Sequence, residues 1–196
     1  MQKLKKSSNK KFTVIVFYGT FAVGKYTVAN EFQKRTGYKF FHNHNAYDIA
    51  RNLFERDTIN LCRLYENINL MVFKEVADAK INVVTTHAFA SSYVSKTGVS
   101  DPAYMKKIES IITRAGGMAI FVHLKADKNS LLKRVAGNSR KKFLKLQNPK
   151  LLKGILENVN KDWITSAPVK NNFIIDNTKL SPKKVADIII KHFKIK

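Results

Sequence analysis

A short apolar run leads directly into a glycine-bounded loop, and this pair constrains the fold more than any other feature of the sequence. Residues 12–18 read FTVIVFY, mostly β-branched or aromatic, which is typical of a strand covered on both faces. Residues 19–25 read GTFAVGK, and apolar side chains follow at helical spacing from Val28 to Phe32. The order of strand, glycine loop and helix is the context in which the pattern G-x-x-x-x-G-K binds phosphate.

The residue types of this loop suit a polyphosphate. Glycines let the backbone approach phosphates closely, and successive N–H groups at a helix N-terminus attract negative charge. Lys25 is expected to reach the β- and γ-phosphate oxygens. A glycine turn with a solvated lysine is the alternative, but it fits the flanking strand and helix less well. The expected nucleotide contacts are Gly19, Phe21, Ala22, Val23, Gly24, Lys25, Tyr26 and Thr27.

The position after Lys25 departs from the common motif. It usually carries a serine or threonine that binds Mg²⁺, but here Tyr26 occupies it and Thr27 comes one residue later. The spacing G-K-x-T resembles that of adenylate-kinase-like enzymes, in which phosphate oxygens and water hold most of the Mg²⁺ shell. Thr27 is therefore expected to bind phosphate and is a secondary candidate for the metal.

Strand and helix patterns alternate along the rest of the chain. They predict an α/β fold, a three-layer α/β/α domain with a mainly five-stranded parallel sheet. Asp127 is a suitable N-cap for one helix, and Gly37 for the end of another. Further strands are expected at 38–41, 81–86, 118–124 and 173–176, and further helices at 46–56, 58–79, 103–115, 150–163 and 181–193.

The chain reads as one domain with two basic segments. Residues 1–11 form a basic N-terminal extension and residues 12–196 a single domain, in which residues 137–153 predict a small basic lid. The run after residue 11 is too short to cross a bilayer and leads into the glycine loop instead of a cleavage site, so neither a secretory signal nor a membrane partner is expected. The single cysteine, Cys62, favours a cytoplasmic protein without disulfides.

The net charge is the unusual feature of the composition. Lys and Arg number 36 against 14 Asp and Glu, a formal charge of +22, which favours anionic partners. Nucleotides, phosphorylated metabolites and nucleic acid all qualify, and a lysine-rich bias spread over solvated faces is an equally weighted alternative.

Four stretches carry a resemblance to a known family. Residues 17–29 and 36–44 are similar to a branch of small P-loop kinases related to shikimate kinase, adenylate kinase and chloramphenicol phosphotransferase. The similarity extends to residues 123–134 and 175–182, and covers about a third of the chain closely. It implies a nucleotide-binding kinase that uses ATP and Mg²⁺, and the phosphate loop is its only highly specific element.

In the family that the chain resembles, acidic residues after the second strand meet the phosphoryl acceptor. Here His42-Asn43-His44 takes that place, and strand alternation predicts His42 and His44 on one side, facing the ligand crevice. We interpret both as acceptor-binding residues, either able to act as a base. A structural strand cap and a zinc site lacking further ligands are the alternatives. Asp48 would orient the acceptor or a metal-bound water, or is an ordinary first-turn acid.

The third strand ends in Thr85-Thr86-His87, where many P-loop proteins carry an aspartate that holds metal-bound water. None is present. His87 is a candidate for lining the acceptor pocket, whereas strand-end packing is favoured for Thr85 and Thr86. The missing carboxylate leaves a weak or altered hydrolytic centre as an alternative.

The resemblance also implies roles for two arginines and a polar turn. Arg134 and Arg140 stand where related kinases carry lid arginines that fold over the transferring phosphoryl group, and both are catalytic candidates beside Lys25. A solvated basic face is the alternative for Arg140. Asp176 and Thr178 lie where the family contacts the adenine, although a simple polar loop explains them almost as well.

These expectations converge on an ATP-dependent phosphotransferase. The predicted acceptor is a small hydroxylated or phosphorylated molecule such as a nucleoside, nucleotide or metabolite. A P-loop NTPase or nucleotide switch without an acceptor, and a nucleic-acid-associated kinase, are the alternatives, with nucleic acid the less favoured partner.

Overall fold

The sheet has the predicted composition and direction. The structure, a computed structural model, describes residues 11–137, 146–158 and 162–195. Its five strands lie in the order β2-β3-β1-β4-β5, and every neighbouring pair is parallel. The strands are β1 (Thr13–Gly19), β2 (Lys39–Phe41), β3 (Val83–Ala88), β4 (Met118–Lys125) and β5 (Asn172–Asp176).

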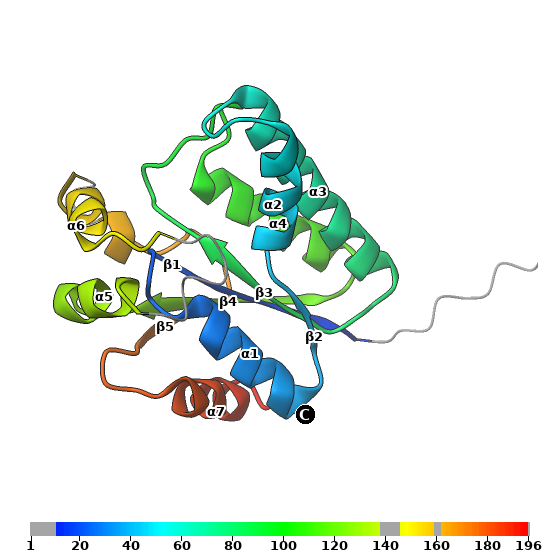
Figure 1. Ribbon diagram of the computed structural model, residues 1–196. Helices are drawn as coiled ribbons and strands as arrows, with labels where there is room; N and C mark the ends of the chain where they lie inside the picture. The colour runs from blue at the N-terminus through cyan, green and yellow to red at the C-terminus, as the bar shows by residue number, and fades with distance from the viewer. Residues whose placement is uncertain (1–10, 138–145, 159–161, 196) are drawn as a thin grey trace, which may run out of the picture.

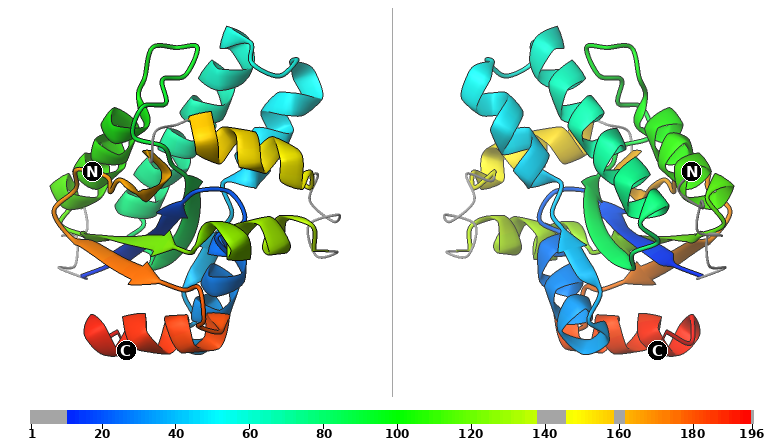
Figure 2. Two further views of the ribbon diagram at one scale, coloured as in Figure 1. Left: turned by 90° about the vertical axis from the view of Figure 1, so that its left-hand side faces the viewer. Right: turned by 90° about the vertical axis from the view of Figure 1, so that its right-hand side faces the viewer.

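Helices cover both faces of this sheet, which confirms the three-layer α/β/α prediction. Figure 1 shows α1 and α7 on one face and α3 and α4 on the other. Figure 2 shows α5 and α6 side by side beyond one end of the sheet. The helices are α1 (Lys25–Thr36), α2 (His44–Leu53), α3 (Ile59–Asp78), α4 (Asp101–Arg114), α5 (Lys128–Val135), α6 (Pro149–Asn158) and α7 (Pro182–His192).

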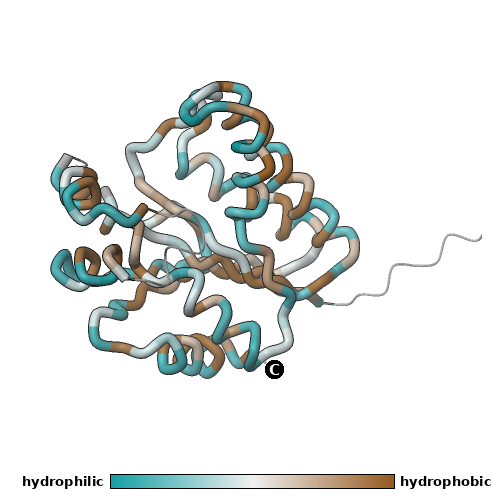
Figure 3. The backbone as a smooth tube through the Cα atoms, viewed as in Figure 1, coloured by the Kyte–Doolittle hydropathy of each residue, from teal (hydrophilic) through white to brown (hydrophobic). Residues whose placement is uncertain are grey.

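Strand β1 divides the core in two because its side chains alternate between faces. Ile15 and Phe17 pack with the side chains of α1 and α7, whereas Val14, Val16 and Tyr18 pack with those of α3 and α4. All five are fully buried, and Figure 3 shows the hydrophobic residues concentrated along the sheet. The buried strand that precedes the glycine loop therefore holds the loop's first residue in a fixed place.

The predicted helix ends are largely confirmed. The Asp127 side chain accepts a hydrogen bond from the Ser130 N–H and caps α5, and Ser181 caps α7 in the same way. Gly37, with a φ of 70°, ends α1 in a left-handed turn and donates its N–H to the Gln33 carbonyl. These caps succeed as predictions because each depends on residues within four positions.

Other boundaries differ from the prediction. Strand β3 begins at Val83 instead of residue 81, and the helix expected at 150–163 ends at Asn158, before a short 3₁₀ turn at Asp162–Ile164. The described end of the predicted lid, residues 149–153, belongs to α6, because proline suits the first turn of a helix and Asn148 Oδ1 accepts from the N–H groups that follow. Residues 1–10 and 138–145, with Arg140, lie outside the described residues.

Among the described residues, no helix has both the length and the apolar character needed to cross a bilayer.

Candidate functional site

The glycine loop lies at the carboxyl end of β1, between β1 and α1. Strand β1 is central in the sheet, and its last residue pairs with Ala88 at the end of β3. Ligands of open parallel sheets bind at the carboxyl ends of the strands. The loop is thus placed where this fold binds its ligands.

Three residues give the loop its shape. Gly19, Ala22 and Gly24 have φ values of 134°, 60° and 96°, all in the left-handed region. A Cβ atom at Gly19 would lie 2.5 Å from the Leu124 carbonyl oxygen, so β4 admits only glycine there. Ala22 adopts this conformation at a cost of about 1 kcal/mol. Backbone turned in this way directs N–H groups into a concavity that suits anions.

The start of α1 adds to this concavity. Gly24 precedes the helix and has no side chain to cap it, so the first N–H groups remain for a ligand. The Lys25 Nζ donates to the carbonyl oxygens of Gly19 and Thr20, at 2.8 and 2.7 Å, and thus lies folded over the loop. This geometry fits a nucleoside triphosphate, because the glycine backbone, the N-terminus of α1 and the Lys25 ammonium all lie around the loop. Thr27 lies exposed in the first turn of α1.

A buried amide holds the loop from below. The Asn177 Nδ2 donates to the Val23 carbonyl oxygen at 2.8 Å, and the Asn177 backbone N–H donates to the Lys125 carbonyl oxygen at 2.8 Å. Asn177 is 4% exposed. It therefore ties the glycine loop to the turn that follows β5. In the sequence, Asn177 is only one residue of the stretch 175–182 that carries the resemblance, because its burial beneath the loop has no local signal.

Arg134 joins the same arrangement. Its guanidinium donates to the Asn177 and Thr178 carbonyl oxygens at 2.8 and 3.1 Å and to Asn177 Oδ1 at 3.1 Å. It also reaches the Val23 carbonyl oxygen at 3.5 Å. These contacts hold the turn after β5 and the glycine loop together, so in this structure Arg134 fixes the position of the loop.

The polar turn after β5 is internally bonded. The Thr178 N–H donates to Asp176 Oδ1 at 2.7 Å, and Thr178 Oγ1 accepts from the Asp127 N–H at 2.9 Å. Asp176 is exposed. The turn is therefore fixed against α5 and, through Asn177, against the glycine loop.

The two histidines lie together, but the predicted reason was wrong. Strand β2 ends at Phe41, His42 follows it, and His44 is already the first residue of α2. Strand alternation therefore does not apply; the immediate start of the helix brings the rings to a centroid distance of 4.9 Å. The Tyr26 ring also lies 4.9 Å from that of His42. Tyr26 thus connects the glycine loop to the histidines.

Hydrogen bonds extend from His42 into the neighbouring elements. Its Nδ1 lies 2.9 Å from Thr86 Oγ1, and the Thr86 hydroxyl donates to Asn43 Oδ1 at 3.1 Å. Asn43 Nδ2 donates in turn to the Tyr65 hydroxyl at 3.1 Å. The sequence favours strand-end packing for Thr86 and gives no signal of this network at Asn43 or Tyr65.

His87 lies on the side of β3 that faces α3 and α4. Its Nε2 is 3.4 Å from Asp101 Oδ1, and Asp101 Oδ2 accepts from the Ala90 N–H at 2.9 Å. Both side chains are buried, and the His87 ring stacks on that of Tyr104 with centroids 5.2 Å apart.

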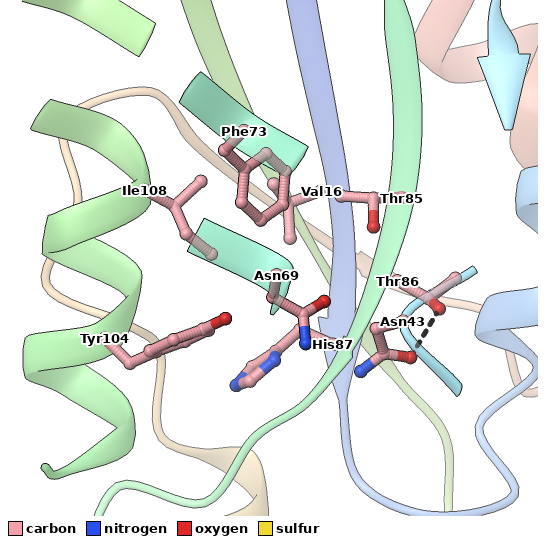
Figure 4. A pocket seen from close by; sticks show the side chains of 9 residues that line it. All are labelled: Val16, Asn43, Asn69, Phe73, Thr85, Thr86, His87, Tyr104 and Ile108. Atoms are coloured by element: carbon pink, nitrogen blue, oxygen red, sulfur yellow. Dashed lines mark hydrogen bonds between the residues drawn. The ribbon is translucent and has the colours of Figure 1, made fainter. Parts of the chain in front are cut away.

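A cavity of about 10 Å³ lies beside His87, as Figure 4 shows. That volume is enough for about one water molecule. Thr85 Oγ1 and the Tyr104 hydroxyl line the cavity, and neither finds a hydrogen-bond partner among the described residues. The cavity is too small for an acceptor molecule.

Asp48 lies exposed on α2, four residues beyond His44. In the part of the chain that the structure describes, no three His, Cys, Asp or Glu side chains form a group that could hold a metal ion. The zinc alternative therefore gains no support from the described residues.

Comparison with solved structures decides the fold class. A sugar kinase from Janibacter has a TM-score of 0.62 at 15% identity, covering 94% of this chain and 95% of that one. Shikimate kinase from Acinetobacter baumannii, solved with shikimate, has a TM-score of 0.59 at 17% identity, covering 93% of each chain. The fold is that of the P-loop small-molecule kinases.

A further similar structure is the YorR protein of Bacillus subtilis, solved with phosphorylated GDP. Its TM-score is 0.59 at 19% identity, covering 92% of this chain and 95% of that one. The sequence matches no protein-family model and no curated protein. The likeness establishes the architecture, whereas the activity has to be argued from the site itself.

Proposed function

We propose that the protein is an ATP-dependent phosphotransferase that acts on a small hydroxylated or phosphorylated acceptor. The observation that carries the proposal is the shape of the loop between Gly19 and Lys25. Its left-handed residues, the uncapped start of α1 and the folded Lys25 make one concave, positively charged surface. The proposal is supported by Tyr26, in the first turn of α1, whose ring lies 4.9 Å from that of His42.

The roles follow from the positions. Lys25 exchanges its two loop carbonyls for the β- and γ-phosphate oxygens and neutralises charge as the phosphoryl group moves. Arg134 positions the loop, and Arg140, outside the described residues, remains a proposed lid arginine. Asp176 and Thr178 are proposed to frame the adenine. Mg²⁺ would neutralise phosphate charge, held mainly by phosphate oxygens and water, with Thr27 as a proposed protein group in its shell.

The proposed acceptor lies over the carboxyl ends of β2 and β3. His42 and His44 are proposed to bind it, with Asp48 on α2 as an additional proposed contact; His87, buried against Asp101 and Tyr104 beside a cavity too small for an acceptor, is left out of this set. Because phosphoryl transfer needs little covalent chemistry from the protein, positioning of acceptor and phosphate provides most of the catalysis.

The decisive experiment is nucleotide binding by a loop variant. ATP with Mg²⁺ is expected to raise the Tm of the wild type, because a ligand that binds only the folded state stabilises it by mass action. Lys25→Ala should lose most of that increase. Lys34→Ala is the matched control: it lies on the same helix, is exposed and pairs only with Glu31 among the contacts described, so it should retain the increase. Equal protection of wild type and Lys25→Ala would contradict the proposal.

Acceptor-dependent release of ADP then tests the transfer step. Candidate sugars, nucleosides and nucleotides are added singly, and one that raises ADP release while gaining phosphate identifies the acceptor class. ADP release that no acceptor raises would support the NTPase alternative instead. That alternative is favoured by one observation, the absence of a carboxylate from β3, which reads VVTTHA.

The charge of +22 keeps a nucleic-acid-associated kinase as another candidate. Such binding depends on release of counterions and weakens steeply with salt. Retention of single-stranded DNA or RNA at about 0.15 M salt would favour it, whereas loss of all binding at that ionic strength would remove it.

A further inference from the structure

The network around His42 determines which of its nitrogens carries the proton. The Thr86 hydroxyl has a single proton, and it is donated to Asn43 Oδ1, an atom that only accepts. Thr86 Oγ1 must therefore accept from the His42 Nδ1–H, 2.9 Å away. A neutral imidazole has one N–H, so Nε2 is left with a lone pair.

The orientation of the Asn43 amide is part of this inference, because the Tyr65 hydroxyl can either accept or donate a hydrogen bond. Asn43 Nδ2 donates to the Tyr65 hydroxyl at 3.1 Å, which leaves Oδ1 facing Thr86. Tyr65 comes from α3 and Thr86 from β3, so two separate elements hold the amide. Burial raises the pKa of Tyr65 well above its ordinary value, and its hydroxyl stays neutral.

Resting on the proposed phosphotransferase function, we propose that Thr86, Asn43 and Tyr65 position His42 as the base that takes a proton from a hydroxyl acceptor. The hydrogen bonds run in one direction and fix His42 in its Nδ1–H form. Nε2 then accepts a hydrogen bond and does not donate one. The proposed acceptor group is accordingly a hydroxyl, because a phosphate anion would need an N–H donor at this place.

The step balances with the groups that the proposal names. The acceptor hydroxyl oxygen forms a bond to the γ-phosphorus, and the bond from that phosphorus to the β–γ bridging oxygen breaks, releasing ADP. The hydroxyl proton moves to Nε2 and makes His42 an imidazolium. Thr86 Oγ1 continues to accept from Nδ1–H throughout, so the ring does not reorient when it gains charge.

Tyr26 places this base beside the nucleotide. Its ring centroid lies 4.9 Å from that of His42, and it directly follows Lys25 in the first turn of α1. His42 is 9% exposed, its Nε2 is buried, and its ring lies against those of Tyr26 and His44, so the inference requires one of these rings to move before an acceptor can reach Nε2. Tyr26 thus occupies the usual hydroxyl position of the motif with a side chain that covers the base.

Nitrogen NMR of the full chain tests the inference without any activity assay. The protein is labelled with ¹⁵N-histidine and studied at about pH 8, above the ordinary histidine pKa of about 6.5. A His42→Gln variant assigns the signal. The expected result is a His42 ring with a protonated Nδ1 and an unprotonated Nε2. A protonated Nε2 in the wild type would overturn the inference, because it corresponds to the reversed network with Asn43 turned over.

Three substitutions then test the positioning residues. Thr86→Val keeps the shape but removes the hydroxyl, and the Nδ1–H preference of His42 should be lost. Thr86→Ser should restore it. Thr85→Val is the matched control one residue away, since the Thr85 hydroxyl has no partner among the described residues, and it should leave His42 unchanged. An unchanged His42 signal in Thr86→Val would also overturn the inference.

The outcomes separate the two proposals. An Nδ1–H ring in a protein that no acceptor stimulates to release ADP would leave the network standing and remove the phosphotransferase. An Nε2–H ring in a protein that phosphorylates an acceptor would do the reverse.

Discussion

Replacement of Arg134 distinguishes a positioning role from direct contact with the transferring phosphate. Its guanidinium makes three hydrogen bonds of 3.1 Å or less to Asn177 and Thr178, and reaches the Val23 carbonyl oxygen at 3.5 Å. Arg134→Ala removes all of them and leaves carbonyl oxygens of the turn without these donors.

The magnitude follows from the number and setting of these bonds. A hydrogen bond that involves a charged group contributes about 1.5–3 kcal/mol when well buried. These are partly buried and share one donor group, so we expect a total loss of about 2–3 kcal/mol. For a chain of this size, each kcal/mol changes the Tm by about 2–4 °C. Arg134→Ala should therefore lower the Tm of the nucleotide-free protein by about 4–12 °C.

The assay is thermal unfolding without nucleotide, followed by ATP titration. Arg134→Lys keeps the charge but lacks the planar fork, so it should recover little of the stability. Lys133→Ala, an exposed neighbour on α5, should change the Tm by less than about 2 °C, as surface substitutions usually do. An unchanged Tm in Arg134→Ala together with a large loss of phosphate transfer would refute the positioning argument and favour direct contact with the phosphate.

Two further predictions concern the loop and the strand beneath it. In urea unfolding, Gly19→Ala should lower the free energy of unfolding by several kcal/mol, because the new Cβ would lie 2.5 Å from the Leu124 carbonyl oxygen of β4. The same variant should lose its protection by nucleotide. Gly154→Ala in α6 is the control: its Cβ would meet nothing within 4 Å, so its stability should be unchanged or higher. Burial, with Lys125 adding to it, lowers the pKa of His123 to about 4. The unfolded chain therefore binds this proton more readily between about pH 6.5 and 4, so stability is complete above that range and falls as the pH falls through it. His123→Gln should flatten the fall in urea midpoints, and equal slopes would contradict the assignment.

Most of the fold could be predicted because its signals are local. The apolar run of β1, the glycine loop and the caps at Gly37, Asp127 and Ser181 each depend on residues a few positions apart. The parallel direction of the sheet followed from alternation of strands and helices. The end of β2 at Phe41 was also predicted, but strand alternation was wrongly carried on to His42 and His44, because α2 begins at His44 and only the pairing with β3 shows where the extended backbone stops.

The hydrogen bonds of the site could not be predicted from the sequence, because they join residues far apart in the chain. His42 and Thr86 are 44 positions apart and meet only because β2 lies next to β3. Arg134 and Asn177 are 43 positions apart and meet because β4 lies next to β5. The sequence indicated that Arg134 belongs to the site, but only the strand order shows which oxygens it reaches.

Strand β3 carries no carboxylate, but a long-range contact brings one to its end. Helix α4 brings Asp101 to the end of that strand, whereas the sequence placed Asp101 two residues before the helix expected from residue 103. Both carboxylate oxygens are engaged, one by the Ala90 N–H and one near His87 Nε2, on the side of the sheet that faces α3 and α4. Asp101 therefore holds the turn after β3 and does not replace the absent aspartate. Because the His42 ring lies 4.9 Å from that of Tyr26, in the first turn of α1, and is proposed to be oriented by Thr86, an imidazole is the basic group that the geometry offers beside the proposed phosphate site.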